Sequence, residues 1–196
     1  MMGKYRLSGI AILTLAMTAA GVGTTMAQKS APAAKPGMSD MSTGAAKQDE
    51  NRGKLEIKLG GKAVSIDYGR PEMKGRDMLA QAPDGYVWRF GMDESTTFKT
   101  DANLMFGDKK LMKGTYSALM KHVKGEQWSL IFNKEVGIQG DPSGIRANDV
   151  LEVPFTYSKS ARSVEKFTVQ LMQMSGGGHL MANWGTHQLD IMFKAQ

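Results

Sequence analysis

The stretch KLEIKLGGKAVSIDY, residues 54–68, determines the fold class that we expect for this chain. Apolar and charged residues alternate from residue 54 to residue 59, and this period of two is typical of a strand with one buried face. Gly60-Gly61 can adopt the left-handed backbone of a two-residue hairpin turn. Because the alternation continues over residues 64–68, the stretch predicts an antiparallel hairpin against a hydrophobic core.

Alternating segments recur along the rest of the chain, separated by turns that contain glycine. Pro154 has no amide hydrogen to donate, so its segment is expected to be an edge strand or to contain a bulge. Residues 137–149 contain Gly, Pro and Asp and predict a longer loop, whereas Gly185-Thr186 predicts a tight turn. The predicted strands cover residues 95–100, 104–106, 109–112, 115–122, 127–133, 151–157, 164–174, 180–184 and 187–193.

Many short strands between turns indicate an all-β fold, and we expect an antiparallel, jelly-roll-like β-sandwich. A flattened β-barrel is the alternative, because the spacing of strands in a sequence does not separate the two. The chain has 196 residues, of which 41% are hydrophobic, enough for one domain with a core. It contains no cysteine, which excludes disulfides, thiolate metal sites and cysteine nucleophiles.

The first residues have the pattern of an export signal. Lys4 and Arg6 precede an apolar run over residues 10–20, and Thr25-Met26-Ala27 places small residues where a signal peptidase reads them. We therefore expect a signal peptide over residues 1–27, cleavage near Ala27, and a periplasmic or extracellular location. The apolar run is interrupted and shorter than the roughly 20 residues that a membrane span needs, so no membrane span is expected in the mature chain.

Residues 28–52 are rich in Ala, Lys, Ser, Gly and Pro, a composition that predicts a disordered linker before a folded domain over residues 53–196. Loss of Lys4 and Arg6 with the signal peptide would lower the formal charge from +6 by 2 to +4. The remaining lysines are scattered and do not form the basic stripe typical of nucleic-acid binding, so no nucleic-acid partner is expected. The oligomeric state is not constrained by the sequence.

Several ordered motifs lie in and after the central part of the chain. They are Asp67-Tyr68-Gly69-Arg70-Pro71, Lys74-Gly75-Arg76, Val87-Trp88-Arg89, residues 91–97, residues 113–117 and residues 128–134. Together they resemble the signature of the DUF2911 family over about residues 54–193. The resemblance implies a secreted or periplasmic bacterial β-domain whose biochemical function is not established. Where that family tends to show Ala-Asn-Glu-Ala, this chain has Met92-Asp93-Glu94-Ser95, and Asp93 can only accept hydrogen bonds when ionised.

The central stretch also combines rigid charges with aromatic residues, which makes it the predicted site for a small anionic or polyhydroxylated ligand such as a carbohydrate. Guanidinium groups match carboxylates and phosphates, and a Trp face suits a sugar ring. For Arg89 itself the sequence favours a structural role, enclosed and paired with Asp93 or Glu94, because buried charges need partners. Arg70, Arg76 and Glu94 are then the residues most expected to contact a ligand. The predicted ligand-binding residues are Arg70, Lys74, Arg76, Trp88, Arg89 and Glu94.

Two further hypotheses are weaker. Glu94 and Asp93 are candidate acids for a hydrolase, although neighbouring residues on a strand face opposite ways. If Gly185-Thr186 is a turn, His179, Met181 and Met192 share one face with Asp190 nearby, a candidate Cu(I) site against the plainer interpretation of adaptable methionines covering a sheet. No nucleotide-binding or hydrolase motif is present, so no cofactor is predicted.

Overall fold

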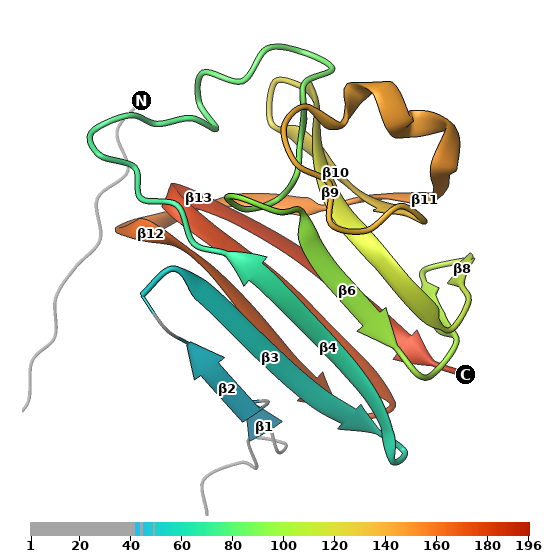
Figure 1. The fold of residues 1–196 in the computed structure, drawn as a ribbon. Coiled ribbons are helices and arrows are strands. Elements are labelled where there is room, and N and C mark those ends of the chain that lie inside the picture. Colours follow the sequence, from blue (N-terminus) through green and yellow to red (C-terminus); the bar gives the residue numbers. More distant parts are fainter. Residues whose placement is uncertain (1–41, 44, 49) are drawn as a thin grey trace, which may run out of the picture. The chain divides into compact units, whose positions relative to one another are not determined.

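The computed structural model describes residues 42–43, 45–48 and 50–196, with side chains from residue 50 onward. The predicted signal peptide lies outside the described residues, as does residue range 28–41 of the predicted linker. The described strands belong to one compact unit, Met38–Gln196, and form two antiparallel sheets (Figure 1).

The larger sheet has the strand order β11-β10-β9-β6-β4-β3-β2, and β5 pairs with β9 beside this path. The hairpin predicted from residues 54–68 is confirmed, since β3 and β4 pair from Arg52↔Gly69 to Leu59↔Lys62 on either side of Gly60-Gly61. The strands of this sheet are β2 (Ala45–Gln48), β3 (Arg52–Leu59), β4 (Lys62–Gly69), β5 (Val87–Trp88), β6 (Thr96–Thr100), β9 (Gly114–Lys124), β10 (Gln127–Asn133) and β11 (Asp149–Pro154).

The smaller sheet has the order β1-β12-β13-β7-β8. The short β7–β8 hairpin turns at Gly107-Asp108, as the sequence predicts, and β7 pairs with the end of β13. The strands of this sheet are β1 (Ser42–Thr43), β7 (Leu104–Phe106), β8 (Lys109–Leu111), β12 (Thr156–Met174) and β13 (Gly177–Ala195).

β13 doubles back on itself at Gly185. A straight strand of 19 residues would be roughly 60 Å long, yet the amide of Ala195 donates to the carbonyl of Gly176 at 3.1 Å. Gly185 has a φ of 59°, which supports the predicted turn at Gly185-Thr186. The contact between Ala195 and Gly176 also fits the register in which His179 lies opposite Met192.

The core lies between the two sheets and contains many aromatic rings among its aliphatic side chains. Phe167 of β12 meets Tyr68 of β4 at 5.8 Å between ring centroids, and Phe98 of β6 meets Phe193 of β13 at 6.3 Å. Each of these side chains occupies an inward position of an alternating strand and is buried. Two separate sheets around one core define a β-sandwich, and in the described residues the sheets do not close into the alternative flattened barrel.

The structure differs from the sequence prediction around Phe155 and within the predicted linker. The segment 151–157 divides at Phe155, so that Pro154 ends β11 in the larger sheet while Tyr157 belongs to β12 in the smaller sheet. β11 is the edge strand that Pro154 predicts. Within the predicted linker, residues 42–43 and 45–48 are strands, because β1 pairs with β12 and β2 pairs with β3.

The predicted long loop after β10 contains a 3-10 helix, η1 (Pro142–Asn148). Asp141 caps its N-terminus by accepting a hydrogen bond from the amide of Ser143 at 2.9 Å, and Pro142 occupies the first turn, where no amide hydrogen is needed. Within the part of the chain that the structure describes, no helix has the length and apolar character needed to cross a membrane.

Candidate functional site

The chain leaves β4 at Gly69 and first runs beside β12. The amide of Phe167 donates to the carbonyl of Pro71 at 2.8 Å, and the amide of Met73 donates to the carbonyl of Glu165 at 3.0 Å. These bonds extend the edge of the smaller sheet with a segment that comes from the end of the larger sheet. The first part of the predicted site is therefore tied to both sheets.

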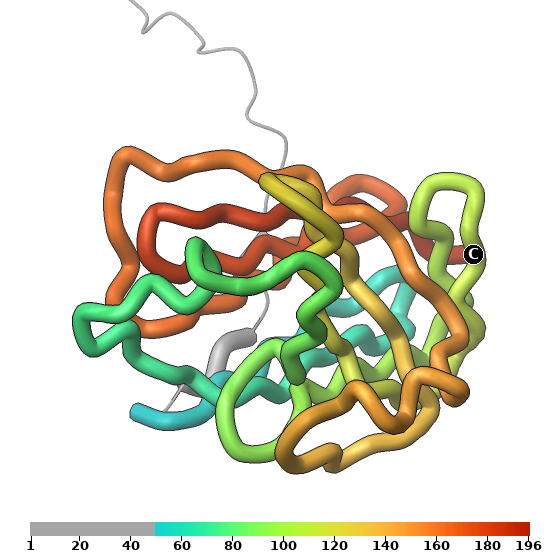
Figure 2. Tube along the Cα trace, turned by 90° about the horizontal axis from the view of Figure 1, so that it is seen from above, coloured from blue at the N-terminus to red at the C-terminus, as the bar shows by residue number. Residues whose placement is uncertain are grey.

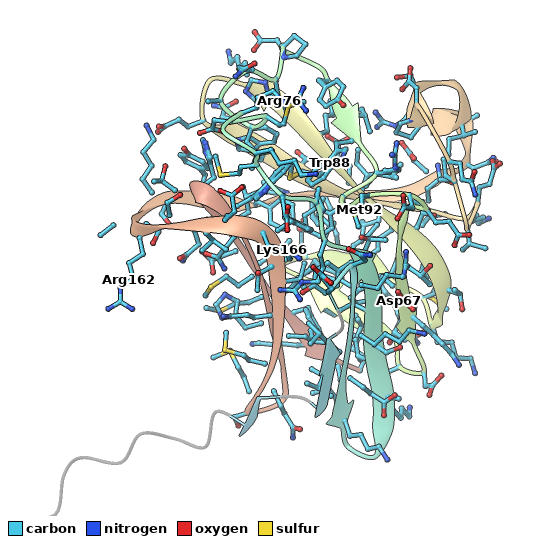
Figure 3. All side chains as sticks on the ribbon, turned by 60° about the vertical axis from the view of Figure 1, so that its left-hand side comes forward. Asp67, Arg76, Trp88, Met92, Arg162 and Lys166 are labelled. Atoms are coloured by element: carbon cyan, nitrogen blue, oxygen red, sulfur yellow. The ribbon has the colours of Figure 1, made fainter. Side chains whose placement is uncertain are left out.

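Arg70, Lys74 and Arg76 lie in different surroundings in the part of the chain that the structure describes. Arg70 lies beside the hydroxyl of Tyr68, which is fully buried and bonded to the backbone of Val169. Burial raises the pKa of Tyr68, while the hydrogen bond to Val169 and the charge of Arg70 act in the opposite direction. Lys74 and Arg76 are exposed, and Figure 3 shows Arg76 in the loop outside the two sheets.

Trp88 packs into the core from the short strand β5. Its ring stacks on Trp184 with centroids 5.2 Å apart and planes 14° apart, and it meets Phe167 edge-on at 5.1 Å. β5 is held in place by pairing of Val87 with Lys121 and of Trp88 with Met120. Trp88 therefore supports the core and, as a residue, remains partly exposed.

Arg89 follows Trp88 and is partly buried. Its Nη1 donates to the carbonyl of Gly140 at 2.9 Å, but its buried Nε has no hydrogen-bond partner. No ion pair joins Arg89 to Asp93, Glu94 or another acid among the described residues. The expectation that Arg89 is held by a neighbouring carboxylate is therefore wrong: the chain turns at Phe90 and Asp93, with φ of 57° and 63°, and the two acids remain exposed.

The segment after this turn is joined to the loop that follows β10. Ser95 and Ile138 bond through their backbones at 2.8 Å, and Glu94 forms an isolated bridge with Gln139. Figure 2 shows these two segments side by side, in light green and gold. This arrangement brings the loop around Gly140 to Arg89, although about fifty residues separate them in sequence.

Trp88 and Arg89 line a pocket of about 320 Å³, which is of the order of the smallest ligand pockets in proteins. Its remaining walls come from the start of β5 and from the residues that enter η1. Arg70, Lys74, Arg76, Asp93 and Glu94 are not among the lining residues. The full lining is Tyr86, Val87, Trp88, Arg89, Gly140, Asp141 and Pro142.

Asp141 places an anion in the same pocket wall. Hydrogen bonds from the hydroxyl and the amide of Ser143 hold the pKa of Asp141 below its usual range, so the carboxylate is ionised at neutral pH. Both bonds end on Oδ1, and in the described residues Oδ2 accepts none. The pocket thus offers a cation at Arg89 and an acceptor at Asp141.

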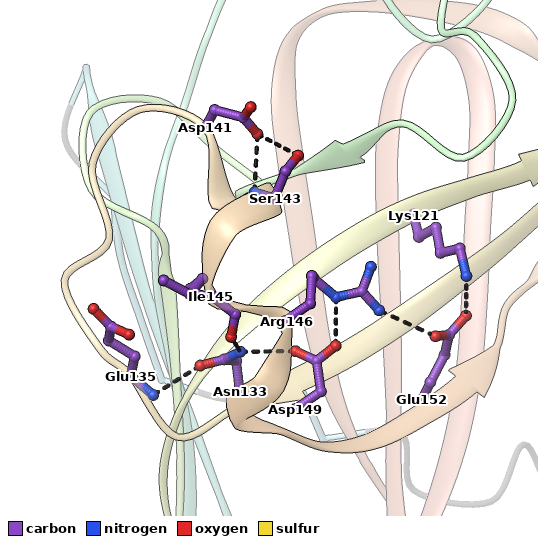
Figure 4. Close-up of polar contacts among 9 residues, drawn as sticks. All are labelled: Lys121, Asn133, Glu135, Asp141, Ser143, Ile145, Arg146, Asp149 and Glu152. Atoms are coloured by element: carbon purple, nitrogen blue, oxygen red, sulfur yellow. Dashed lines mark hydrogen bonds and ion pairs between the residues drawn. The ribbon is translucent and has the colours of Figure 1, made fainter.

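A polar network holds this wall against the larger sheet (Figure 4). Asn133 donates to the carbonyl of Ile145 at 3.0 Å and to Asp149 at 2.7 Å, while Arg146 pairs with Asp149 and reaches Glu152 at 3.3 Å. These contacts fix η1 on β10 and β11. The backbone of residues 140–142 is therefore positioned before any ligand arrives.

The sequence pattern singled out Trp88 and Arg89, which line this pocket, and did not single out residues 140–142. The signal was present in Gly140-Asp141-Pro142, a turn string at the start of a long loop, and long loops in compact domains frequently carry sites. The sequence does not show that this loop contacts Arg89, because the contact depends on the pairing of segments that are far apart in the chain.

A second polar cluster joins the loop before β5 to the hairpin in β13. Nε2 of His187 lies 3.0 Å from both carboxylate oxygens of Asp77, and Nδ1 lies 2.9 Å from the hydroxyl of Tyr157. Burial acts to raise the pKa of Asp77, but the hydrogen bonds from the amide of Ala80 and from His187 outweigh it, so this pKa lies below its ordinary value. Burial raises the pKa of Tyr157.

The remaining candidates lie on the outer face of the smaller sheet. Nε2 of His179 is 2.8 Å from Asp190, which the predicted hairpin register placed nearby. Across the described residues, no group of three or more His, Cys, Asp or Glu side chains is placed to hold a metal ion. A site on this face would therefore depend on methionine thioethers.

The fold and the site define this protein as an all-β sandwich domain with an arginine-containing pocket at one end of the larger sheet. The family described as "Protein of unknown function (DUF2911)" matches residues 50–193, and the chain belongs to this family. No curated protein and no solved structure is significantly similar to the chain.

Proposed function

We propose that this domain is a binding module for a small carboxylate ligand that also carries hydroxyl groups, such as a sugar acid. The observation that supports the proposal most directly is the state of Arg89. Its guanidinium is partly dehydrated in the wall of a pocket, bonded to a single carbonyl and matched by no carboxylate among the described residues. Dehydrated charges are costly unless they are paired, and a bound anion would supply the partner.

The other walls of the pocket fit the rest of such a ligand. Trp88 is partly exposed, and an indole suits the apolar side of a sugar ring. Oδ2 of Asp141 can accept a hydrogen bond from a ligand hydroxyl, because Ser143 occupies Oδ1. A plain inorganic anion would leave this acceptor unused and would meet the charge of Asp141 as well as that of Arg89. The combination therefore favours a hydroxylated carboxylate.

Isothermal titration calorimetry with glucuronate tests this function, with glucose as the uncharged counterpart of the same ring. We expect saturable binding of glucuronate, little or no binding of glucose, and a loss of affinity of roughly 10- to 100-fold in Arg89→Met, because a hydrogen bond to a charged group contributes about 1.5–3 kcal/mol. Arg162→Met is the matched control, since Arg162 is exposed at a bend of β12 (Figure 3).

Two results would contradict the proposal. Equal binding of glucose and glucuronate would show that the carboxylate of the ligand does not contribute to affinity. Unchanged affinity in a folded Arg89→Met variant would show that Arg89 does not contact the ligand. Thermal unfolding of each variant without ligand separates a loss of binding from a loss of folding.

We also propose that the domain works after export, in the periplasm or outside the cell. This proposal rests on the cationic start, the apolar run and the small residues that end at Ala27. Mass spectrometry of the protein from the producing cells tests it. We expect a mature chain that begins at Gln28, and a chain that retains residues 1–27 would contradict it.

A further inference from the structure

The outer face of the smaller sheet carries an unusual concentration of sulfur. Phe167, Val169 and Leu171 of β12 are almost fully buried in the core, so the residues between and after them face outward. In β13, Leu180 and Ala182 face the core in the same way. Figure 3 shows methionine sulfur atoms along the outer side of the β12–β13 ribbons. The outward methionines of this sheet are Met105, Met172, Met174, Met181 and Met192.

His179 lies between two of these methionines in neighbouring strands. Met172 of β12 is its direct partner in the antiparallel register. On the other side, the bond from Ala195 to Gly176 sets the register of the β13 hairpin and places Met192 opposite His179. Directly opposed residues have Cβ atoms about 4.5–5.5 Å apart. At this spacing, the thioethers of Met172 and Met192 and the imidazole of His179 can reach one common ion.

Asp190 prepares the imidazole of His179 for such a role. An ionised carboxylate only accepts hydrogen bonds, so the contact at 2.8 Å makes Nε2 of His179 the donor and leaves the lone pair on Nδ1. No hydrogen bond of Nδ1 with the protein occurs in the described residues. Asp190 is itself held by Gln188 at 2.9 Å. A histidine that binds a metal through one ring nitrogen commonly donates the N–H of the other nitrogen to a carboxylate.

A pocket of about 340 Å³ at the end of the sheet gives access to the methionines around His179. Met192 lines it, together with Met105 and Met174. The side chain of Met192 is 62% exposed, whereas His179 is 9% exposed beneath its neighbours. An ion could therefore approach along the exposed side chain of Met192 and reach an imidazole that is shielded from water.

We propose that this face binds Cu(I) through Nδ1 of His179 and the thioethers of Met172 and Met192. Neutral, polarizable sulfur and imidazole ligands favour Cu(I) over hard divalent cations, which require oxygen ligands. The partly exposed side chains of Met105 and Met174 extend the same soft surface at the entrance. The proposal uses a different surface from the Arg89 pocket and does not depend on ligand binding there.

Titration of the purified chain with Ag(I), a stable ion with the coordination chemistry of Cu(I), tests the site. We expect saturable binding by calorimetry and shifts of the Met172 and Met192 methyl resonances in spectra of methyl-labelled methionine. The double variant Met172→Leu/Met192→Leu should lose at least about 10-fold in affinity, because Leu keeps the volume and removes the sulfur. Met112→Leu is the control, since Met112 is 55% exposed near the β8–β9 turn.

The contradicting results are equally specific. Absence of Ag(I) binding, unchanged affinity in the folded double variant, or an equal loss in Met112→Leu would each overturn the site. Stronger binding of Zn²⁺ than of Ag(I) would also overturn it, because this ligand set is too soft for that preference. The competition should be repeated with Cu(I) under anaerobic conditions, where the same order of affinities is expected.

Discussion

At the scale of single residues, Gly69 is the residue that allows the candidate pocket to form. A Cβ atom at this position would lie 2.2 Å from the carbonyl oxygen of Met92, far inside van der Waals contact. The turn that follows Arg89 therefore packs directly on the backbone at the end of β4. Thr96 secures the turn by donating to the carbonyl of Phe90 at 2.6 Å.

We predict that Gly69→Ala destabilises the domain by roughly 1–3 kcal/mol, because the added methyl group must displace rigid backbone. The displacement would also move Arg89 and weaken ligand binding. Gly144→Ala is the control: no atom lies within 4 Å of the Cβ that it adds, and we expect a change within about 0.5 kcal/mol. Urea unfolding measures both, and equal stability of the two variants would contradict the close packing at Gly69.

The same scale explains why the role of Arg89 could not be predicted. In the sequence it stands between two aromatic residues with two acids nearby, which favours a local ion pair. Positive φ at Phe90 and Asp93 turns the backbone so that the acids point away to solvent. Such backbone turns at residues other than glycine are uncommon and leave no clear pattern in a sequence.

At the scale of elements, the loop between β4 and β5 is held on the β13 hairpin by Asp77 and His187, which are 110 residues apart in the chain. The side chain of Met73 adds contact by lying 3.1 Å from where a Cβ on Gly185 would be. The loop is thus clamped at the corner of the hairpin, close to Trp184 and its stacking partner Trp88. This clamp positions β5 and, through it, the pocket.

This clamp predicts a specific dependence on pH. The folded pKa of Asp77 lies below its ordinary value of 3.8, so its contribution to stability is complete above about pH 5 and is lost as the pH falls through the folded pKa. Asp77→Asn should remove that part of the dependence, so its unfolding free energy should fall less steeply than that of the wild type in acid. Denaturant unfolding between pH 7 and pH 2.5 measures the slopes.

The control for this experiment is Asp108→Asn, which changes an exposed acid in the β7–β8 turn. It should keep the acid sensitivity of the wild type. Parallel curves for the wild type and Asp77→Asn would show that the clamp does not couple protonation to folding.

At the scale of the described domain, local patterns predicted the hairpins better than they predicted the sheets. The turns at Gly60-Gly61 and Gly107-Asp108 join strands that pair with each other, so period and turn chemistry suffice to define them. Phe155 is different, because the alternating apolar residues on either side of it, Val153 and Tyr157, enter different sheets. The division depends on the core between the sheets, which no local window contains.

The candidate sites follow the same division. Trp88 and Arg89 could be identified from residue type, but their pocket wall at residues 140–142 is set by the pairing of Ser95 with Ile138. His179, Met181, Met192 and Asp190 could be placed on one face because a single hairpin relates them. Met172 could not, because it comes from the neighbouring strand β12.

The central claim is that Arg89 binds a carboxylate in the pocket formed with Trp88 and residues 140–142. Two-dimensional ¹⁵N spectra recorded during a titration with glucuronate test it most directly, by following Nε–H of Arg89, the indole N–H of Trp88 and the backbone amides of residues 140–143. We predict saturable shifts of these signals with a common dissociation constant. Shifts confined to Lys74 and Arg76, or the absence of any saturable shift, would contradict the claim.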